Sequence, residues 1–180
     1  MGEVQAGILA PLPPQARYLE FSATAHLGAA AALRDLCGLA DGQGVVLGIG
    51  ASLLQALGHE VEGLRCFAGA TGSGIEVPAT PAALWCWLRG DDRGELLHRT
   101  RAIEAALGAA FRLERCVDAF RHGRGLDLSG YEDGTENPAG DDALAAAVVT
   151  GRGPGRTARV SWPCSSGGTR SNASTQCPRH

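Results

Sequence analysis

The residues best suited to chemistry lie between Gly130 and Pro138, where the sequence reads GYEDGTENP. One carboxylate, that of Asp133, precedes a glycine in a stretch without hydrophobic periodicity, so the segment is predicted to be a loop. An Asp-Gly pair is common in turns, where the carboxylate accepts hydrogen bonds from nearby backbone amides. From these residues alone, a turn is the simplest interpretation of Asp133.

Further acidic and amide side chains follow the glycine and raise the alternative of a calcium-binding loop. They are Glu136, Asn137, Asp141 and Asp142. Calcium prefers carboxylate and carbonyl oxygens, but an EF-hand loop has a different spacing and ends in a glutamate. We therefore expect no calcium site in this segment.

A second pattern, Gly48-Ile49-Gly50, resembles the start of a dinucleotide-binding fingerprint. It falls between a predicted strand and a predicted helix, as such a fingerprint should. However, Leu53 occupies the position of the third glycine, and no second parallel β-α unit follows. A simple strand-to-helix turn is the better interpretation.

Hydrophobic periodicity predicts the elements that must position these residues. Strands are predicted over residues 16–23, 44–50, 84–88 and 111–120, and helices over 27–40, 52–57 and 92–107. Asp92 and Glu95 resemble a capping box at the start of the last helix. Residues 58–81 are rich in Gly, Pro and Thr and are expected to form a long connection with one short strand near residues 64–67.

The order of these elements, β-α-β followed by β-α-β, indicates an α+β protein with a ferredoxin-like domain. Its sheet should be antiparallel, with both long helices on one face. We expect Trp85 and Trp87 to point to opposite faces of their strand, so that at least one lies in the core. The cysteines at positions 37, 66, 86 and 116 are expected to be mostly buried thiols.

The extended motif resembles the signature of the dye-decolourising (Dyp-type) haem peroxidases, and especially their compact bacterial branch. The segments that carry this resemblance are PQARYLEFS, VVLGIGASLLQALG, LWCWLRGDDRGELLHRTRAIEAAL and FRLERCVDAFRHGRGLDLSGYEDGTENPAG. They cover about residues 7–150 and contain the G-x-x-D-G element at Gly130 to Gly134. The resemblance implies the first half of a dimeric ferredoxin-like fold, with the peroxidase N-terminal domain over residues 1–122 and a distal haem loop over 123–155.

The resemblance also implies a haem b cofactor and the use of hydrogen peroxide to oxidise phenolic or dye-like donors, which are small aromatic reductants. In the family the Asp of the motif, here Asp133, takes a proton from the peroxide and returns it to the oxygen that leaves as water. Gly130 and Gly134 would let the loop backbone approach the porphyrin. The residues implied at the cofactor are Gly130, Asp133, Gly134, Thr135, Glu136 and Asn137.

The family's distal arginine and proximal histidine belong to the second half, for which this chain has no counterpart. None of His26, His59, His98 and His122 occupies a matching position, and we expect them to be surface residues. The prediction is therefore an inactive, truncated form of a peroxidase that would form a homo-oligomer when intact. The alternative is a non-enzymatic fragment that binds intact subunits.

Residues 156–180 differ in composition from the rest of the chain, since they contain no Leu, Ile, Phe, Asp or Glu. Such a segment cannot bury an apolar face and is predicted to be a disordered tail. A frameshift in the gene near residues 151–156 would explain the change in composition.

The overall composition fits one globular protein, with 180 residues, 44% of them hydrophobic, and a formal net charge of −3. The arginines are scattered among acidic residues, so neither nucleic acid nor an anionic membrane is an expected partner. No secretory leader and no apolar run of membrane-spanning length is present, which favours a cytoplasmic protein.

Overall fold

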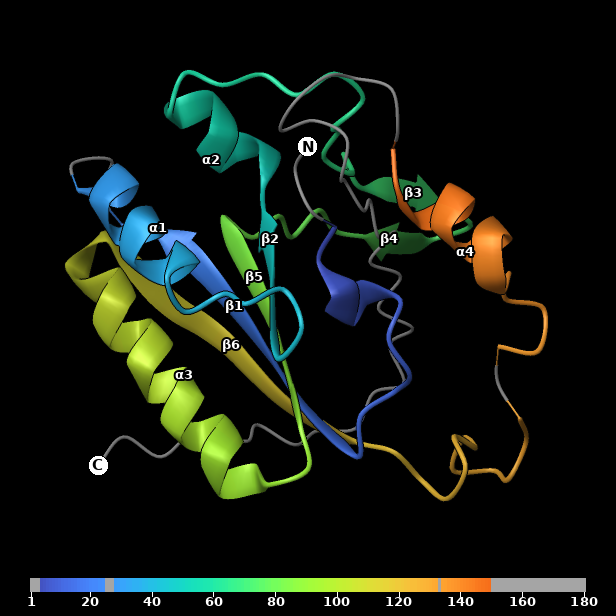
Figure 1. Cartoon of the computed structure of the whole chain (residues 1–180). Helices are drawn as coiled ribbons and strands as arrows, with labels where there is room; N and C mark the ends of the chain where they lie inside the picture. Colours follow the sequence, from blue (N-terminus) through green and yellow to red (C-terminus); the bar gives the residue numbers. More distant parts are fainter. Residues whose placement is uncertain (1–3, 25–27, 133, 150–180) are drawn as a thin grey trace. The chain divides into compact units, whose positions relative to one another are not determined.

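The computed structural model describes residues 4–24, 28–132 and 134–149 (Figure 1). Contacts within the chain divide it into two units, one formed by residues 5–135 and the other containing residues 4 and 136–149 of the described part. The predicted boundaries at residues 122 and 155 remain predictions, and residues 156–180 lie outside the described residues.

The first unit contains a four-stranded sheet, whose strands are β1 (Gln15–Ala23), β2 (Val45–Ile49), β5 (Leu84–Gly90) and β6 (Phe111–Phe120). Their order across the sheet is β2-β5-β1-β6, and all three neighbouring pairs are antiparallel. This is the strand order of a ferredoxin-like fold, in which the two β-α-β units interleave. The predicted α+β class and antiparallel sheet are confirmed.

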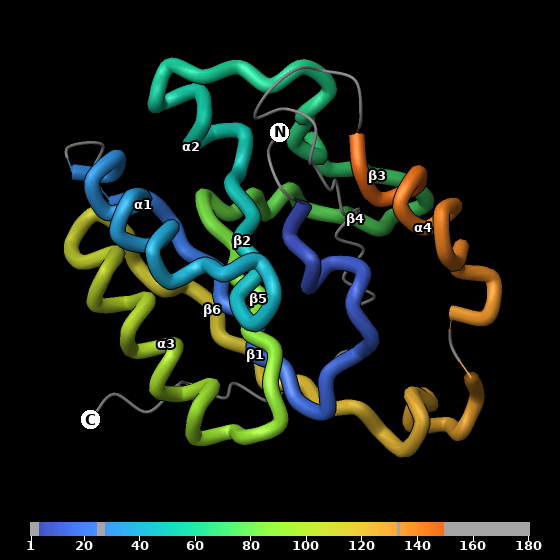
Figure 2. The backbone as a smooth tube through the Cα atoms, viewed as in Figure 1, coloured from blue at the N-terminus to red at the C-terminus, as the bar shows by residue number. Residues whose placement is uncertain are grey.

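Helices α1 (Ala29–Cys37) and α3 (Arg93–Leu107) follow β1 and β5, while the short α2 (Ala51–Ala56) follows β2. Figures 1 and 2 show α1 and α3 side by side on one face of the sheet. The predicted arrangement of both long helices is therefore confirmed. The Asp92 carboxylate caps α3 by accepting a hydrogen bond of 2.8 Å from the backbone N–H of Glu95.

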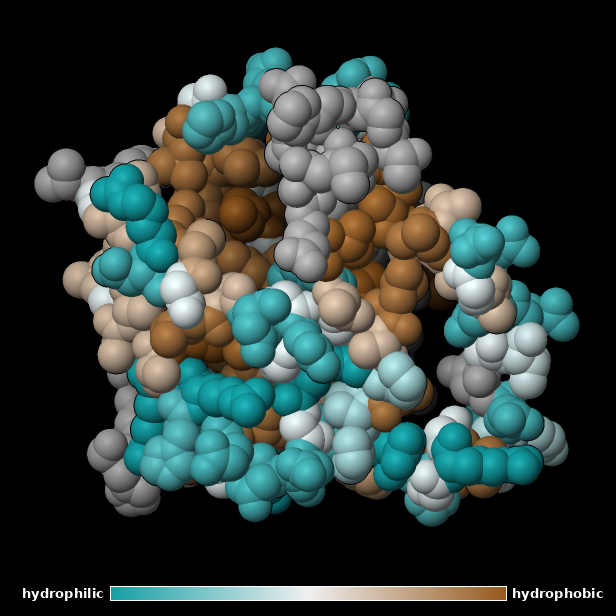
Figure 3. All heavy atoms as spheres, in the orientation of Figure 1, coloured by the Kyte–Doolittle hydropathy of each residue, from teal (hydrophilic) through white to brown (hydrophobic). Residues whose placement is uncertain are grey.

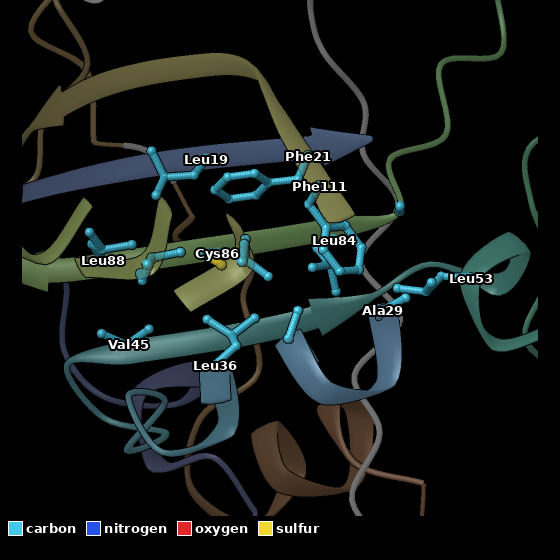
Figure 4. Close-up of a cluster of buried hydrophobic side chains, with 14 of the residues drawn as sticks. Leu19, Phe21, Ala29, Leu36, Val45, Leu53, Leu84, Cys86, Leu88 and Phe111 are labelled. Carbon is cyan, nitrogen blue, oxygen red and sulfur yellow. The ribbon is translucent and has the colours of Figure 1, made fainter. Parts of the chain in front are cut away.

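The core lies between these helices and the sheet (Figure 4). Leu19 and Phe21 of β1, Leu84 and Leu88 of β5 and Leu36 of α1 contribute to it, and each is almost fully buried. Such side chains stabilise a fold by about 1.5–3 kcal/mol each relative to exposure. This core fixes the sheet from which the loop after β6 extends.

The cysteines are less buried than expected, since Cys37 and Cys66 are exposed and Cys116 is half-buried. Only Cys86, among the four described cysteines, lies in the core. Burial raises the pKa of its thiol to about 12, so it stays protonated at neutral pH.

The opposite face of the sheet carries an aromatic cluster. Tyr18 stacks on both Trp85 and Trp87, with ring centroids 5.7 and 6.1 Å apart. The expectation that the two tryptophans point to opposite faces is wrong, because side chains two residues apart on a strand share a face. Trp87 is nevertheless buried in a second cluster with Ala16 and Val46, on the face away from the helices, so the expectation that at least one tryptophan lies in a core is confirmed.

The connection between α2 and β5 contains a small hairpin of β3 (Ala70–Gly72) and β4 (Ile75–Val77). Ser73 and Gly74 form its turn with φ of 51° and 77°. Such a turn matches the twist of the strands it joins and needs positive φ at both positions. The strand expected near residues 64–67 is not present, because this Ser-Gly pair places the strands further along the chain.

Other short elements are the 3-10 helices η1 (Ala6–Ile8) and η2 (Gly108–Ala110), and α4 (Gly140–Ala147) in the second unit. No helix of the described residues is long and apolar enough to cross a membrane. Apolar side chains also reach the surface of the first unit, as Figure 3 shows around α1 and α2. Exposed examples are Leu39, Ile49, Phe67, Ile75 and Phe120.

Candidate functional site

The loop that carries the G-x-x-D-G motif begins directly after β6. Its start is tied to the N-terminal segment, because the backbone N–H of Arg121 donates to the Pro14 carbonyl at 2.9 Å. The loop then folds back on itself, since Leu126 forms isolated antiparallel bridges with both His122 and Glu132. The segment before the motif is therefore a compact turn structure at the end of an edge strand.

Asp127 organises this turn structure. Its Oδ1 accepts hydrogen bonds from the N–H and hydroxyl of Ser129, at 2.9 and 2.6 Å, and from the N–H of Tyr131 at 3.0 Å. In return, the Asp127 N–H donates to the Tyr131 carbonyl at 2.9 Å. The hydrogen bonds from Ser129 and Tyr131 hold the pKa of this carboxyl below its usual value. Asp127 is thus ionised at neutral pH and sets the backbone path into the motif.

The sequence analysis did not single out Asp127. The signal that could have found it is an Asp followed by Ser two residues later and Gly after that, which is typical of an Asx turn.

Gly130 begins the motif in a conformation that favours glycine, with a φ of +90°. A Cβ at this position would meet nothing within 4 Å, so among the described residues nothing covers its backbone. Gly134 also has a positive φ, of 74°. The loop therefore presents open backbone at Gly130, as close approach of a flat ligand would require.

Asp133, the predicted catalytic residue, lies outside the described residues. Its neighbour Gly134 is exposed, as are Thr135, Glu136 and Asn137. Thr135 ends the first unit, while Glu136 and Asn137 begin the described main part of the second. Within the described residues, the structure gathers none of these side chains into a shared site.

The fit of a haem to this loop is incomplete. Its side chains point to solvent, with Tyr131 75% and Leu128 82% exposed, and the pocket described below lies elsewhere in the fold. His59, His98 and His122 are exposed, whereas His26 is not among the described residues. No group of three His, Cys, Asp or Glu side chains within residues 4–24, 28–132 and 134–149 could hold a metal. The described side chains of the loop therefore do not enclose a porphyrin.

Gly50 explains the apparent dinucleotide fingerprint. A Cβ on this glycine would lie 2.1 Å from the Ala82 carbonyl oxygen, so the backbones pack too closely for any side chain. Its N–H donates to the Ala83 carbonyl at 2.8 Å. Close packing between the end of β2 and the start of β5 therefore requires a glycine here. Gly50 lies at a strand-to-helix turn, as the sequence analysis expects.

Comparison with known sequences shows which proteins this chain resembles. It is 32% identical over 159 residues to the dye-decolorizing peroxidase of Mycobacterium tuberculosis, covering 79% of this chain and 46% of that protein. The chain is related to the dye-decolorizing peroxidases. A dye-decolorizing peroxidase of Rhodococcus erythropolis is 30% identical over 117 residues. No protein-family model matches the chain.

Solved structures of dye-decolorizing peroxidases share the fold. A putative Dyp-type peroxidase of Shewanella oneidensis is 26% identical with a TM-score of 0.68, and covers 86% of this chain and 54% of its own. DypB of Rhodococcus jostii RHA1 has a TM-score of 0.68 at 24% identity, and one variant of it was solved in complex with heme. The chain spans about half the length of the curated relatives it matches.

Proposed function

We propose that this chain carries the distal half of a haem peroxidase of the dye-decolourising type, in which Asp133 is the acid-base group. The observation that carries the proposal is the 32% identity over 159 residues to a curated dye-decolorizing peroxidase. The glycine-bearing loop after β6, with its open backbone at Gly130, supports it. Hydrogen peroxide and small aromatic donors are the proposed substrates.

Haem, when bound, would supply the redox chemistry, and the protein would supply orientation and proton transfer. The Asp133 carboxylate would accept a proton from one peroxide oxygen and deliver it to the oxygen that leaves as water. Gly130 and Gly134 would allow the loop backbone to approach the cofactor. Asp127 would hold the loop in place through its hydrogen bonds to Ser129 and Tyr131.

The chain by itself is proposed to have little or no turnover. In this proposal the loop after β6 would supply only one side of a haem site. The remaining wall and the ligand would come from sequence that lies in the other half of the relatives. The intact protein is further proposed to be a cytoplasmic homo-oligomer.

A chimera tests the proposal directly. Residues 7–149 of this chain would replace the matching segment of the Mycobacterium tuberculosis relative, and haem binding and peroxidase turnover with a phenolic donor would be measured. We expect stoichiometric haem with a sharp Soret band, and turnover that Asp133→Asn lowers by about 100-fold or more. Asp142→Asn, an exposed carboxylate in α4, is the matched control and should leave turnover unchanged.

Two results would contradict the proposal. One is a folded chimera that binds haem but turns over equally well with Asp133→Asn. The other is stoichiometric haem binding with a sharp Soret band by the unmodified chain alone, since the proposal places the iron ligand in the other half of the relatives.

A further inference from the structure

A pocket of about 460 Å³ lies at the end of the sheet where β5 leaves and β2 enters. Its volume falls within the range of about 300–1,000 Å³ that is usual for small-molecule sites. One wall is apolar and comes from the N-terminal segment through Ala10, Pro13 and Pro14. Arg89 and Arg99 line the other side. None of these residues belongs to the motif loop discussed above.

Arg89 is an unusual residue to find here, because it is only 8% exposed and pairs with no carboxylate of the described residues. Its guanidinium lies over the Trp87 ring, with Cζ 4.3 Å from the centroid. Nη2 donates to the Pro11 carbonyl, which is neutral. A buried charge without an opposite charge is costly, and native proteins rarely retain one without compensation.

Two buried donors next to each other also lack acceptors. Within the described part of the chain, Arg89 Nη1 and Trp87 Nε1 have no hydrogen-bond partner, although both atoms are buried. Unsatisfied buried donors are uncommon, and each calls for a missing acceptor. A carboxylate accepts hydrogen bonds and donates none when ionised, so it suits a guanidinium whose charge is unpaired.

The acidic side chains of the pocket do not fill this role. Asp41 Oδ1 already accepts the backbone N–H groups of Gln43, Gly44 and Val45, at 2.7 to 2.9 Å. Asp41 Oδ2 and Arg99 Nη1 both lie close to Gly44, since a Cβ built on that glycine would be 3.2 Å from the first atom and 2.9 Å from the second. The negative charge of Asp41 is therefore near the positive charge of Arg99. Asp91, the other acid of the pocket, is exposed to solvent. Arg89 is left as the uncompensated charge.

We propose that this pocket binds a small organic carboxylate. The carboxylate would pair with the guanidinium of Arg89, which lines the pocket, and its apolar body would lie against Ala10, Pro13 and Pro14. Arg99, which donates to the Arg89 carbonyl at 3.3 Å, would hold that strand end and add positive charge at the rim. This apolar wall favours an organic acid over inorganic phosphate. The site is independent of the haem chemistry proposed above.

Calorimetric titration of the full chain with benzoate, at fixed ionic strength, tests the proposal. Benzamide is the neutral probe of the same shape, and inorganic phosphate tests for a general anion site. We expect saturable one-to-one binding of benzoate, and affinity at least about tenfold weaker for benzamide and phosphate. Equal binding of benzamide, preferential binding of phosphate, or no saturable binding by the folded chain would each overturn the proposal.

Variants assign the binding to the pocket. Arg89→Met should weaken benzoate binding by about tenfold or more, because it removes a charge-assisted hydrogen bond. Arg101→Met is the matched control, since Arg101 is exposed on the same helix as Arg99 and does not line the pocket. If Arg89→Met does not fold, Arg99→Met is used and should weaken binding several-fold. Unchanged affinity in a folded Arg89→Met or Arg99→Met chain, or equal weakening by Arg101→Met, refutes the assignment.

Discussion

A bidentate ion pair joins the edge strand β6 to β1 in the interior of the sheet. Arg17 on β1 donates from Nε and Nη2 to the two carboxylate oxygens of Asp118 on β6, at 2.5 and 3.0 Å. Arg17 is nearly buried, whereas the Asp118 side chain is 36% exposed and also receives a hydrogen bond from Arg93. A bidentate pair of this kind adds geometric specificity as well as energy.

The first prediction concerns the acid sensitivity of this pair. The hydrogen bond from Arg17 is the main cause that lowers the pKa of Asp118. A carboxyl with a lowered folded-state pKa stabilises the fold above its unfolded pKa of about 3.9, and this stabilisation is lost as the pH falls through the folded-state value. Asp118→Asn should therefore cost about 2 kcal/mol at about pH 6, a value reduced for the partial exposure of Asp118.

Denaturant unfolding at a series of pH values measures this effect. The difference in unfolding free energy between the wild type and Asp118→Asn should shrink as the pH falls below about 4. Asp91→Asn, an exposed acid without an ion pair among the described residues, should show no such difference. A difference for Asp118→Asn that stays constant across this range would contradict the prediction.

Residue-level predictions from the sequence were least secure where several side chains meet. Periodicity correctly placed Trp85 and Trp87 on one strand. Side chains two residues apart on a strand share a face, and this rule puts both tryptophans on the aromatic face. Asp127 could have been found from its spacing to Ser129, because an Asx turn is a local feature. The unpaired Arg89 could not have been found, since its burial depends on the N-terminal segment packing over β5.

At the scale of elements, the start of α3 depends on one side chain. Asp92 accepts the Glu95 N–H at 2.8 Å and so satisfies one of the free amides of the first turn. The second prediction is that Asp92→Ala lowers the free energy of unfolding by about 1 kcal/mol. Asp91→Ala, one residue outside the helix, should change it by less than about 0.5 kcal/mol in the same urea titration. Equal effects of the two substitutions would show that the cap contributes nothing specific.

Elements with a clear apolar pattern were predictable even when short, since the ranges predicted for β2 and α2 match to within one residue at each end, but the small hairpin was not. Strand β6 has the bounds that alternation predicts, and α3 differs from its predicted range by one residue. The hairpin of β3 and β4 escaped detection because each strand has three residues, all of them exposed, and so carries no burial pattern. Its Ser73-Gly74 turn was the only local signal.

At the scale of the whole molecule, the first unit contains a complete core. Every residue of the buried cluster between helices and sheet lies between Leu19 and Phe111, and all four strands of the main sheet end by Phe120. The ferredoxin-like order was predictable because consecutive β-α-β units with short connections allow few topologies. Asp133 lies outside the described residues, so its role stays a prediction.

The last prediction follows from this closed core. A chain shortened to residues 5–135 should unfold cooperatively, because all residues of both buried clusters lie within it and α4 contributes none. Its unfolding free energy should equal that of the full chain within about 1 kcal/mol, as measured by urea denaturation followed by circular dichroism. Leu36→Ala in the shortened chain is the control for a real core and should cost about 2–5 kcal/mol. A broad transition that is insensitive to Leu36→Ala would mean that the sheet and its helices need residues beyond 135 to pack, and that the unit is not an independent folding domain.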